Sequence, residues 1–107
     1  MIEEFRIILQ PEAFEGMESA YKRIEELQST SAAHLWAAGL MDAIYSLKQF
    51  PHRCQIAREN EFFPYEIRQL LYGTGTRIYR ILFHIKDDSV NILHIRHSFQ
   101  DTLRPNP

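Results

Sequence analysis

The sequence has little cysteine, little glycine and no long apolar run. Its 107 residues include one cysteine and four glycines, and the longest apolar stretch, counting Gly39, covers only residues 35–41. A lone cysteine cannot form an internal disulfide, and that stretch is far below the roughly 20 residues that span a bilayer. Glu3 and Glu4 lie where a signal peptide has positive charge. These absences predict a cytoplasmic protein in a reducing compartment, with no membrane segment.

The residues that are present are typical of an ordinary globular domain. Apolar residues make up 45% of the chain, aromatic residues 12% and charged residues 24%. A chain of this length buries roughly 65% of the surface that its unfolded form exposes, which is enough for a core without disulfides. We therefore predict a single domain over residues 1–107.

Charge is distributed unevenly along the chain. The formal net charge is −2, which is not that of a polycation that coats nucleic acid. Residues 1–50 contain four basic and eight acidic residues, whereas residues 51–107 contain eight basic and six acidic residues and four of the five histidines. An anionic partner is therefore expected to bind the C-terminal half.

Two helices are predicted in the N-terminal half. A short apolar run at 5–9 predicts a first strand, and Pro11 then suits the first turn of a helix because its missing N–H would have no partner there. The larger apolar residues of this helix follow the spacing of one buried stripe: Phe14, Met17, Tyr21 and Ile24. The hydroxyl side chains at 29–31 predict an N-cap, so a second helix is expected to begin near Ser31 and to form an antiparallel hairpin with the first.

The C-terminal half predicts a sheet. The segment 52–64 has no period and is expected to be a functional or partly ordered loop. Three runs typical of strands follow at 66–72, 77–85 and 90–97, joined by short turns. This order indicates an α+β fold, in which an N-terminal strand precedes a helical hairpin packed on a small antiparallel sheet.

Alternation in the run 77–85 predicts which side chains face the helices, because successive strand residues point to opposite faces. The apolar set expected in the core is Tyr79, Ile81, Phe83 and Ile85. If the next turn has an even number of residues, the facing pairs are Arg80 with Ile95, His84 with Asn91 and Ile78 with His97. Arg80, His84 and His97 would then share the face away from the helices, whereas an odd turn or a bulge would change that set.

Arg80 is the main candidate on that face, because its guanidinium stays charged on an otherwise apolar surface. Such an arginine either forms an ion pair or binds an anionic group whose oxygens match its fork. An ion pair would involve an acid such as Glu59 or Glu66. Both interpretations stay open from the residues alone.

His97 is the second candidate, because it lies beside Arg96 with Phe99 two residues further on. The three together offer a titratable group, a cation and a stacking surface. His94 and His97 are three residues apart on a strand, so they point to opposite faces and cannot share a metal ion. Cys54 has no visible orienting group and is expected to be structural. No metal site and no cofactor are predicted.

The ordered motifs of the chain resemble a known family. After the first strand, the helical hairpin ends in Leu47-x-x-Phe50-Pro51, and the strand segments 66–70, 79–83 and 92–97 follow. This set resembles the RelE/ParE toxin superfamily of bacterial type II toxin–antitoxin systems, which includes plasmid stabilisation systems, over essentially the whole chain. The resemblance implies a compact α+β fold and a cognate antitoxin that wraps the toxin and neutralises it. It leaves a homodimer open.

The superfamily has two activities. RelE-like members cleave messenger RNA in the ribosome, whereas ParE-like members inhibit DNA gyrase and are not nucleases. For a nuclease, the resemblance implies that Arg80 holds the scissile phosphate and that His97 is the general acid or base. The segment 98–102 lacks the arginine and tyrosine of RelE-like nucleases, and the hairpin ending resembles the ParE branch.

The first expectation is therefore a ParE-like toxin that binds a protein target of the gyrase class. The alternative is a ribosome-dependent mRNA endonuclease, and a third hypothesis is an inactive member that only binds. Partner contacts are expected from the cationic and aromatic residues of the sheet: Arg68, Arg77, Arg96 and Phe99, together with Arg80 and His97.

Overall fold

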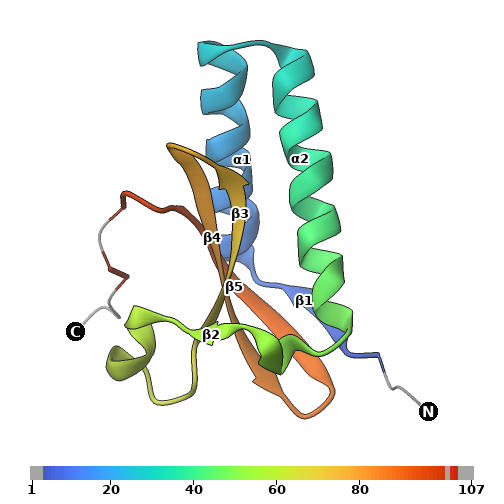
Figure 1. The fold of residues 1–107 in the computed structure, drawn as a ribbon, viewed down its shortest axis with the longest axis vertical. Coiled ribbons are helices and arrows are strands. Elements are labelled where there is room, and N and C mark those ends of the chain that lie inside the picture. The colour runs from blue at the N-terminus through green and yellow to red at the C-terminus, as the bar shows by residue number, and fades with distance from the viewer. Residues whose placement is uncertain (1–3, 101, 104–107) are drawn as a thin grey trace.

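The computed structural model describes residues 4–100 and 102–103, and Figure 1 shows two long helices beside a twisted sheet. The helices and strands are β1 (Arg6–Leu9), α1 (Pro11–Leu27), α2 (Thr30–Tyr45), β2 (Gln55–Ile56), β3 (Arg68–Thr74), β4 (Arg77–Lys86) and β5 (Ser89–His97). Short 3₁₀ helices lie at Ser46–Lys48, Pro51–Arg53 and Arg58–Phe62. The predicted α+β fold is confirmed. The segment 52–64, expected to be a loop, instead contains two of these 3₁₀ helices and strand β2.

The helices form the predicted antiparallel hairpin (Figure 1). Helix α1 begins at Pro11 as expected, and α2 is capped by Ser29, whose Oγ accepts a hydrogen bond from the N–H of Ala32 (3.0 Å). Gly16 lets α1 lie directly on β5, because a Cβ at this position would collide with the carbonyl oxygen of Ile95. In the described residues, neither helix is long and apolar enough to cross a membrane.

The buried face of α1 differs from the predicted stripe. Ala13, Ala20 and Ile24 are buried and Met17 packs against the core, whereas Phe14 is 54% exposed. Small side chains let α1 pack close to the sheet. The prediction considered only the large apolar residues and therefore missed the buried alanines. The prediction that Phe14 is buried was therefore wrong.

The sheet has the strand order β1-β5-β4-β3-β2. The pairs β2–β3, β3–β4 and β4–β5 are antiparallel, but β1 pairs with β5 in parallel. The sheet is therefore mixed, because the chain leaves β1 through the whole helical hairpin and returns to the sheet from the opposite edge. The predicted N-terminal strand thus lies at one edge, and β2 lies at the other.

The predicted inward set of β4 is confirmed: Tyr79, Ile81 and Phe83 are buried in the main core and Ile85 packs against it. The turn at 87–88 has two residues, and His84 faces Asn91 as expected. Beyond that point, Phe83 pairs with Ile92 but Leu82 pairs with His94, so that Leu93 is the extra residue of a β-bulge.

The bulge shifts the remaining pairs of β4 and β5 by one residue. Arg80 faces Arg96 rather than Ile95, and His97 faces Tyr79 rather than Ile78. His97 is therefore on the helix side of the sheet, and the predicted grouping of His97 with Arg80 on the other face was wrong.

Apolar side chains are buried on both faces of the sheet. The main cluster lies between the helices and the sheet and includes Leu40, Ile44 and Phe83. A smaller cluster of Ala57, Ile67 and Leu82 lies on the opposite face. The segment between β2 and β3 covers this face, which explains how the charged residues beside it come to be buried.

Candidate functional site

Arg80 and Glu59 form a buried ion pair on the face away from the helices. Arg80 is 3% exposed and Glu59 is 0% exposed. The Arg80 Nη1 and Nη2 atoms donate to the two carboxylate oxygens of Glu59 at 2.8 and 2.5 Å, and Nε donates to Oε1 of Gln69 at 2.9 Å. Each of the three guanidinium nitrogens thus donates a hydrogen bond within the protein. An external anion would have to displace Glu59 to reach the fork.

Glu59 also holds the C-terminal segment. Its Oε2 accepts a hydrogen bond from the N–H of Leu103 (3.1 Å), and the neighbouring Arg58 donates from Nη2 to the carbonyl oxygen of Gln100 (2.9 Å). Burial alone would raise the pKa of the Glu59 carboxyl, but the hydrogen bonds from Arg80 and Leu103 and the Arg80 charge hold it below its ordinary value. The carboxylate therefore stays ionised inside the protein.

His97 is held by hydrogen bonds at both ring nitrogens. Nε2 donates to the carbonyl oxygen of Thr76 (2.9 Å), and Nδ1 accepts from the N–H of Phe99 (3.1 Å). The ring meets Tyr79 edge-on, with centroids 5.1 Å apart, and lies 5.0 Å from the ring of Phe99. These contacts use Nε2 as the donor and Nδ1 as the acceptor of the ring. The ring connects the turn before β4 to the segment after β5.

The structure does not bring the two candidate nuclease residues together. Arg80 lies on the face of the sheet opposite the helices, whereas His97 faces Tyr79 on the helix side. Arg96 faces Arg80 in the strand register. The sequence could not place these side chains, because a one-residue bulge reverses the face of each later residue in β5.

The remaining predicted contact residues are spread over the molecule. Arg68 donates to the carboxylate of Glu66 (2.8 Å) and to the carbonyl oxygen of Cys54 (2.5 Å), which connects β3 to the segment before β2. Arg77 begins β4 and is exposed, and Phe99 is 75% exposed. Of the predicted residues, Arg77, His97 and Phe99 line one cavity of about 240 Å³.

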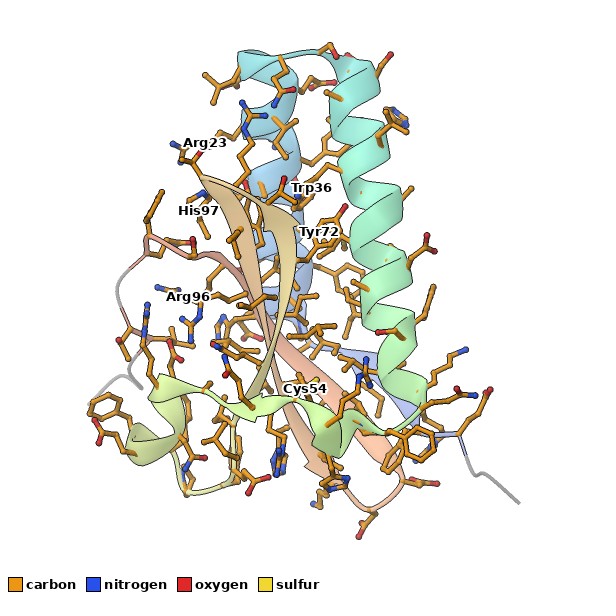
Figure 2. All side chains as sticks on the ribbon, viewed as in Figure 1. Arg23, Trp36, Cys54, Tyr72, Arg96 and His97 are labelled. Atoms are coloured by element: carbon orange, nitrogen blue, oxygen red, sulfur yellow. The ribbon has the colours of Figure 1, made fainter. Side chains whose placement is uncertain are left out.

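This cavity continues along α1 and forms a groove. A second cavity of about 190 Å³ shares Arg23, Tyr79 and His97 with the first, and the two together run between α1 and the segment after β5. We call this the α1–tail groove; its walls are Ser19, Arg23 and Leu27 of α1 and His97, Phe99 and Gln100 opposite. Figure 2 shows Arg23 and His97 on the same side of the hairpin.

The sequence pointed to one wall of this groove and missed the other. The missed wall is formed by Ser19, Arg23 and Leu27 of α1, and Leu27 is 70% exposed. The available signal was spacing: Ser19, Arg23 and Leu27 recur every four residues and so share one helix face. That face carries both a cation and an apolar side chain.

A different cavity, of about 530 Å³, lies on the sheet face away from the helices. His84 Nδ1 donates to the carbonyl oxygen of Glu66 (3.0 Å), and the His84 ring lies 4.3 Å from that of Tyr65. Burial, with the nearby charge of Arg96, lowers the pKa of His94, which lines the same cavity. His94 is therefore neutral near pH 7.

Metal and thiol chemistry receive no support from the arrangement of side chains. Among residues 4–100 and 102–103, no three histidine, cysteine or acidic side chains are grouped as metal ligands would be. His94 faces Leu82 while His97 faces Tyr79, so the two point to opposite faces as predicted. Cys54 is a free, buried cysteine, and burial raises the pKa of its thiol. A protonated thiol is a poor nucleophile.

Comparison with known proteins gives one family and one fold. Residues 7–102 match the family model described as the ParE toxin of type II toxin–antitoxin system, parDE. A solved structure, the chromosomal ParDE toxin–antitoxin system from P. aeruginosa, is similar with a TM-score of 0.71 and 17% sequence identity. The match covers 88% of this chain and 96% of that one, and at this identity it shows the fold alone. No curated protein matches the chain.

Proposed function

The chain belongs to the ParE toxin family of type II toxin–antitoxin systems, and on that basis we propose that it acts in the cytoplasm by binding a protein target of the gyrase class. A cognate antitoxin neutralises it by occupying its surface. The observation that favours protein binding over RNA cleavage is the pairing of Arg80, whose three guanidinium nitrogens each donate to Glu59 or Gln69.

A phosphate clamp needs a guanidinium fork that its ligand can reach. If an RNA phosphate took the place of Glu59 on Arg80, the buried carboxylate would lose its partner, at a cost of about 3–5 kcal/mol. His97 adds to the same argument, because both of its ring nitrogens bond to backbone groups. These two contacts favour structural roles for the two residues that a nuclease would use.

The test is induced expression of the chain in growing bacteria, followed by two measurements on the same culture. We expect growth to stop, plasmid supercoiling to fall and full-length messages to persist. Purified DNA gyrase should lose supercoiling activity when the purified chain is added. Messages cut at ribosomal positions, with gyrase unaffected, would establish the endonuclease alternative instead. Normal growth with a folded protein would establish an inactive member.

A matched variant separates the outcomes at the level of a single residue. His97→Gln keeps a side-chain amide that can donate to Thr76 but removes acid–base chemistry. We expect it to retain growth arrest, since gyrase binding needs no proton transfer. Loss of message cutting in this variant, with an unchanged circular dichroism spectrum, would assign His97 to the nuclease mechanism.

The antitoxin is tested through the neighbouring reading frame. Co-expression of a small protein encoded beside the toxin gene should restore growth, and the two should purify as a complex. A culture that stays arrested despite a stable complex would show that the toxic surface remains open in that complex.

A further inference from the structure

The α1–tail groove carries positive charge on both sides of one cavity. Arg23 comes from α1 and Arg77 from the first position of β4, and both line the 240 Å³ cavity. Gln28, at the end of α1, lines the same cavity as Arg77. No acidic side chain lines the groove among the described residues. The groove is therefore an electropositive site on a chain whose net charge is −2.

The same groove carries apolar surface at its rim and its floor. Leu27 is 70% exposed on one wall, and Phe99 is 75% exposed on the other. Ile24, Tyr79 and Ile95 lie below and are buried. Exposed large apolar side chains that flank a cationic cavity are typical of surfaces that bind a partner rather than water.

Contacts within the protein hold both walls of the groove in place. His97 fixes one wall, since its ring is hydrogen-bonded to Thr76 and to Phe99 at the same time. The opposite wall is one face of α1, which Gly16 seats directly on β5. A segment that enters the groove therefore meets walls that are already ordered, and this lowers the entropic cost of binding.

We propose that the α1–tail groove binds an acidic segment of the antitoxin, with a carboxylate at Arg23 and Arg77 and an apolar side chain between Leu27 and Phe99. This inference rests on the proposed function, because the antitoxin supplies the segment. Arginine matches a carboxylate through two parallel hydrogen bonds. Ion pairs between exposed side chains contribute little free energy. The apolar contact adds buried surface area that strengthens binding.

Nucleic acid fits the groove less well than an acidic peptide. Binding of a phosphate chain depends on many cations along the backbone, whereas this groove offers two arginines. The solvent face of α1 next to it carries acidic side chains that would repel a polyanion: Glu12, Glu15, Glu18, Glu25 and Glu26. A short peptide with one or two carboxylates avoids that repulsion.

The experiment is an NMR titration of the ¹⁵N-labelled full chain with a capped hexapeptide of sequence Ala-Leu-Glu-Leu-Glu-Ala. We expect amide shifts at Arg23, Arg77 and Phe99, and at least tenfold weaker binding of the matched peptide with glutamine in place of glutamate. Arg23→Glu and Arg77→Glu should each weaken binding of the acidic peptide at least tenfold. Lys86→Glu makes the same charge change at the far end of β4, outside the groove, and should leave binding unchanged.

Three results would overturn the proposal. The acidic and glutamine peptides could bind equally, or the shifts could map to residues outside the groove. A ten-nucleotide oligouridylate could also bind the groove more tightly than the acidic peptide, which would show a nucleic-acid site. If a glutamate variant fails to fold, Arg23→Gln with Arg77→Gln removes both charges without reversing them, and the same loss is expected.

Failure of this inference can be told apart from failure of the proposed function. An antitoxin that neutralises the Arg23→Glu, Arg77→Glu double variant as well as the parent chain would refute the groove while leaving the toxin–antitoxin pair intact. A folded chain that neither arrests growth nor inhibits gyrase would refute the proposed function, whatever the peptide titration shows.

Discussion

Replacing Arg80 with methionine tests whether the buried ion pair with Glu59 is structural. The substitution keeps an unbranched side chain of similar length but removes the three hydrogen bonds that Arg80 donates to Glu59 and Gln69. Glu59, which is 0% exposed, would then keep the N–H of Leu103 and the distant guanidinium of Arg58 at 4.0 Å, but no cation in hydrogen-bond contact among the described residues.

The expected magnitude follows from leaving a buried charge without its partner. Removing one member of such a pair costs about 3–5 kcal/mol of unfolding free energy. Domains of this size have about 5–15 kcal/mol in total, so Arg80→Met should be folded only marginally. Arg6→Met is the matched control, because the Arg6–Asp88 pair has both side chains mostly exposed and its loss should cost less than about 1 kcal/mol.

A second substitution separates the lost ion pair from lost packing. Glu59→Met in the Arg80→Met background removes the unpaired charge and fills the space with apolar atoms. We expect this double variant to regain about 2–3 kcal/mol, since apolar replacement of a whole buried pair is often neutral. The N–H of Leu103 and the amide of Gln69 lose a partner, so recovery should be incomplete.

The pH dependence of the unfolding free energy has opposite signs in the parent chain and in Arg80→Met. In the parent, the pKa of Glu59 is held below its ordinary value of 4.5, so its stabilisation is complete above pH 4.5 and is lost as the pH falls further. In Arg80→Met, burial without a partner raises the pKa of Glu59. That variant should therefore be more stable at pH 4.5 than at pH 7, within the window in which Glu59 is protonated.

Urea unfolding followed through Trp36, the single tryptophan, gives the free energies. The reasoning is refuted if Arg80→Met costs no more than Arg6→Met, or if Arg80→Met loses stability on acidification as the parent does. Either result would mean that the Glu59 carboxylate is hydrated.

Three further predictions use the same measurement. Tyr79→Ala should cost about 3–5 kcal/mol because the ring is buried, whereas the exposed Phe14→Ala should cost less than about 1 kcal/mol; equal costs would contradict the observed burial. Gly16→Ala should cost about 1–3 kcal/mol, because its methyl group meets the carbonyl oxygen of Ile95. Burial lowers the pKa of His94, so stability should decline as the pH falls below 6.5, and His94→Gln should reduce that decline between pH 7.5 and 5.5.

Local patterns were sufficient to predict the two long helices, every strand except β2, and the inward face of β4. Pro11 marked the start of α1, and the alternation from Tyr79 to Ile85 predicted which side chains face the helices, because both depend on residues close in the chain. The family resemblance came from the same ordered motifs, and the match over residues 7–102 confirms it. The gyrase target and the roles of single site residues stay predictions.

Contacts between segments that are distant in the sequence were not predictable from local patterns. The parity argument placed His97 beside Arg80, but the bulge at Leu93 put the two on opposite faces. An ion pair of Arg80 with Glu59 or Glu66 was open from the sequence, and the fold of the segment at 58–62 selected Glu59. These outcomes depend on where two distant segments meet, which no local period encodes.

Local sequence patterns established the two long helices, every strand except β2, the order of these elements and the family, because helical and strand periods and turn residues act over a few positions. Tertiary contacts determine which arginines are paired inside the protein and which line a surface groove. Arg80 is buried on Glu59, whereas Arg23, a surface charge by its helical position, lines a groove with Arg77 and Phe99. Whether a guanidinium can bind a further group depends on the neighbours that folding brings to it, and those neighbours are far away in the chain.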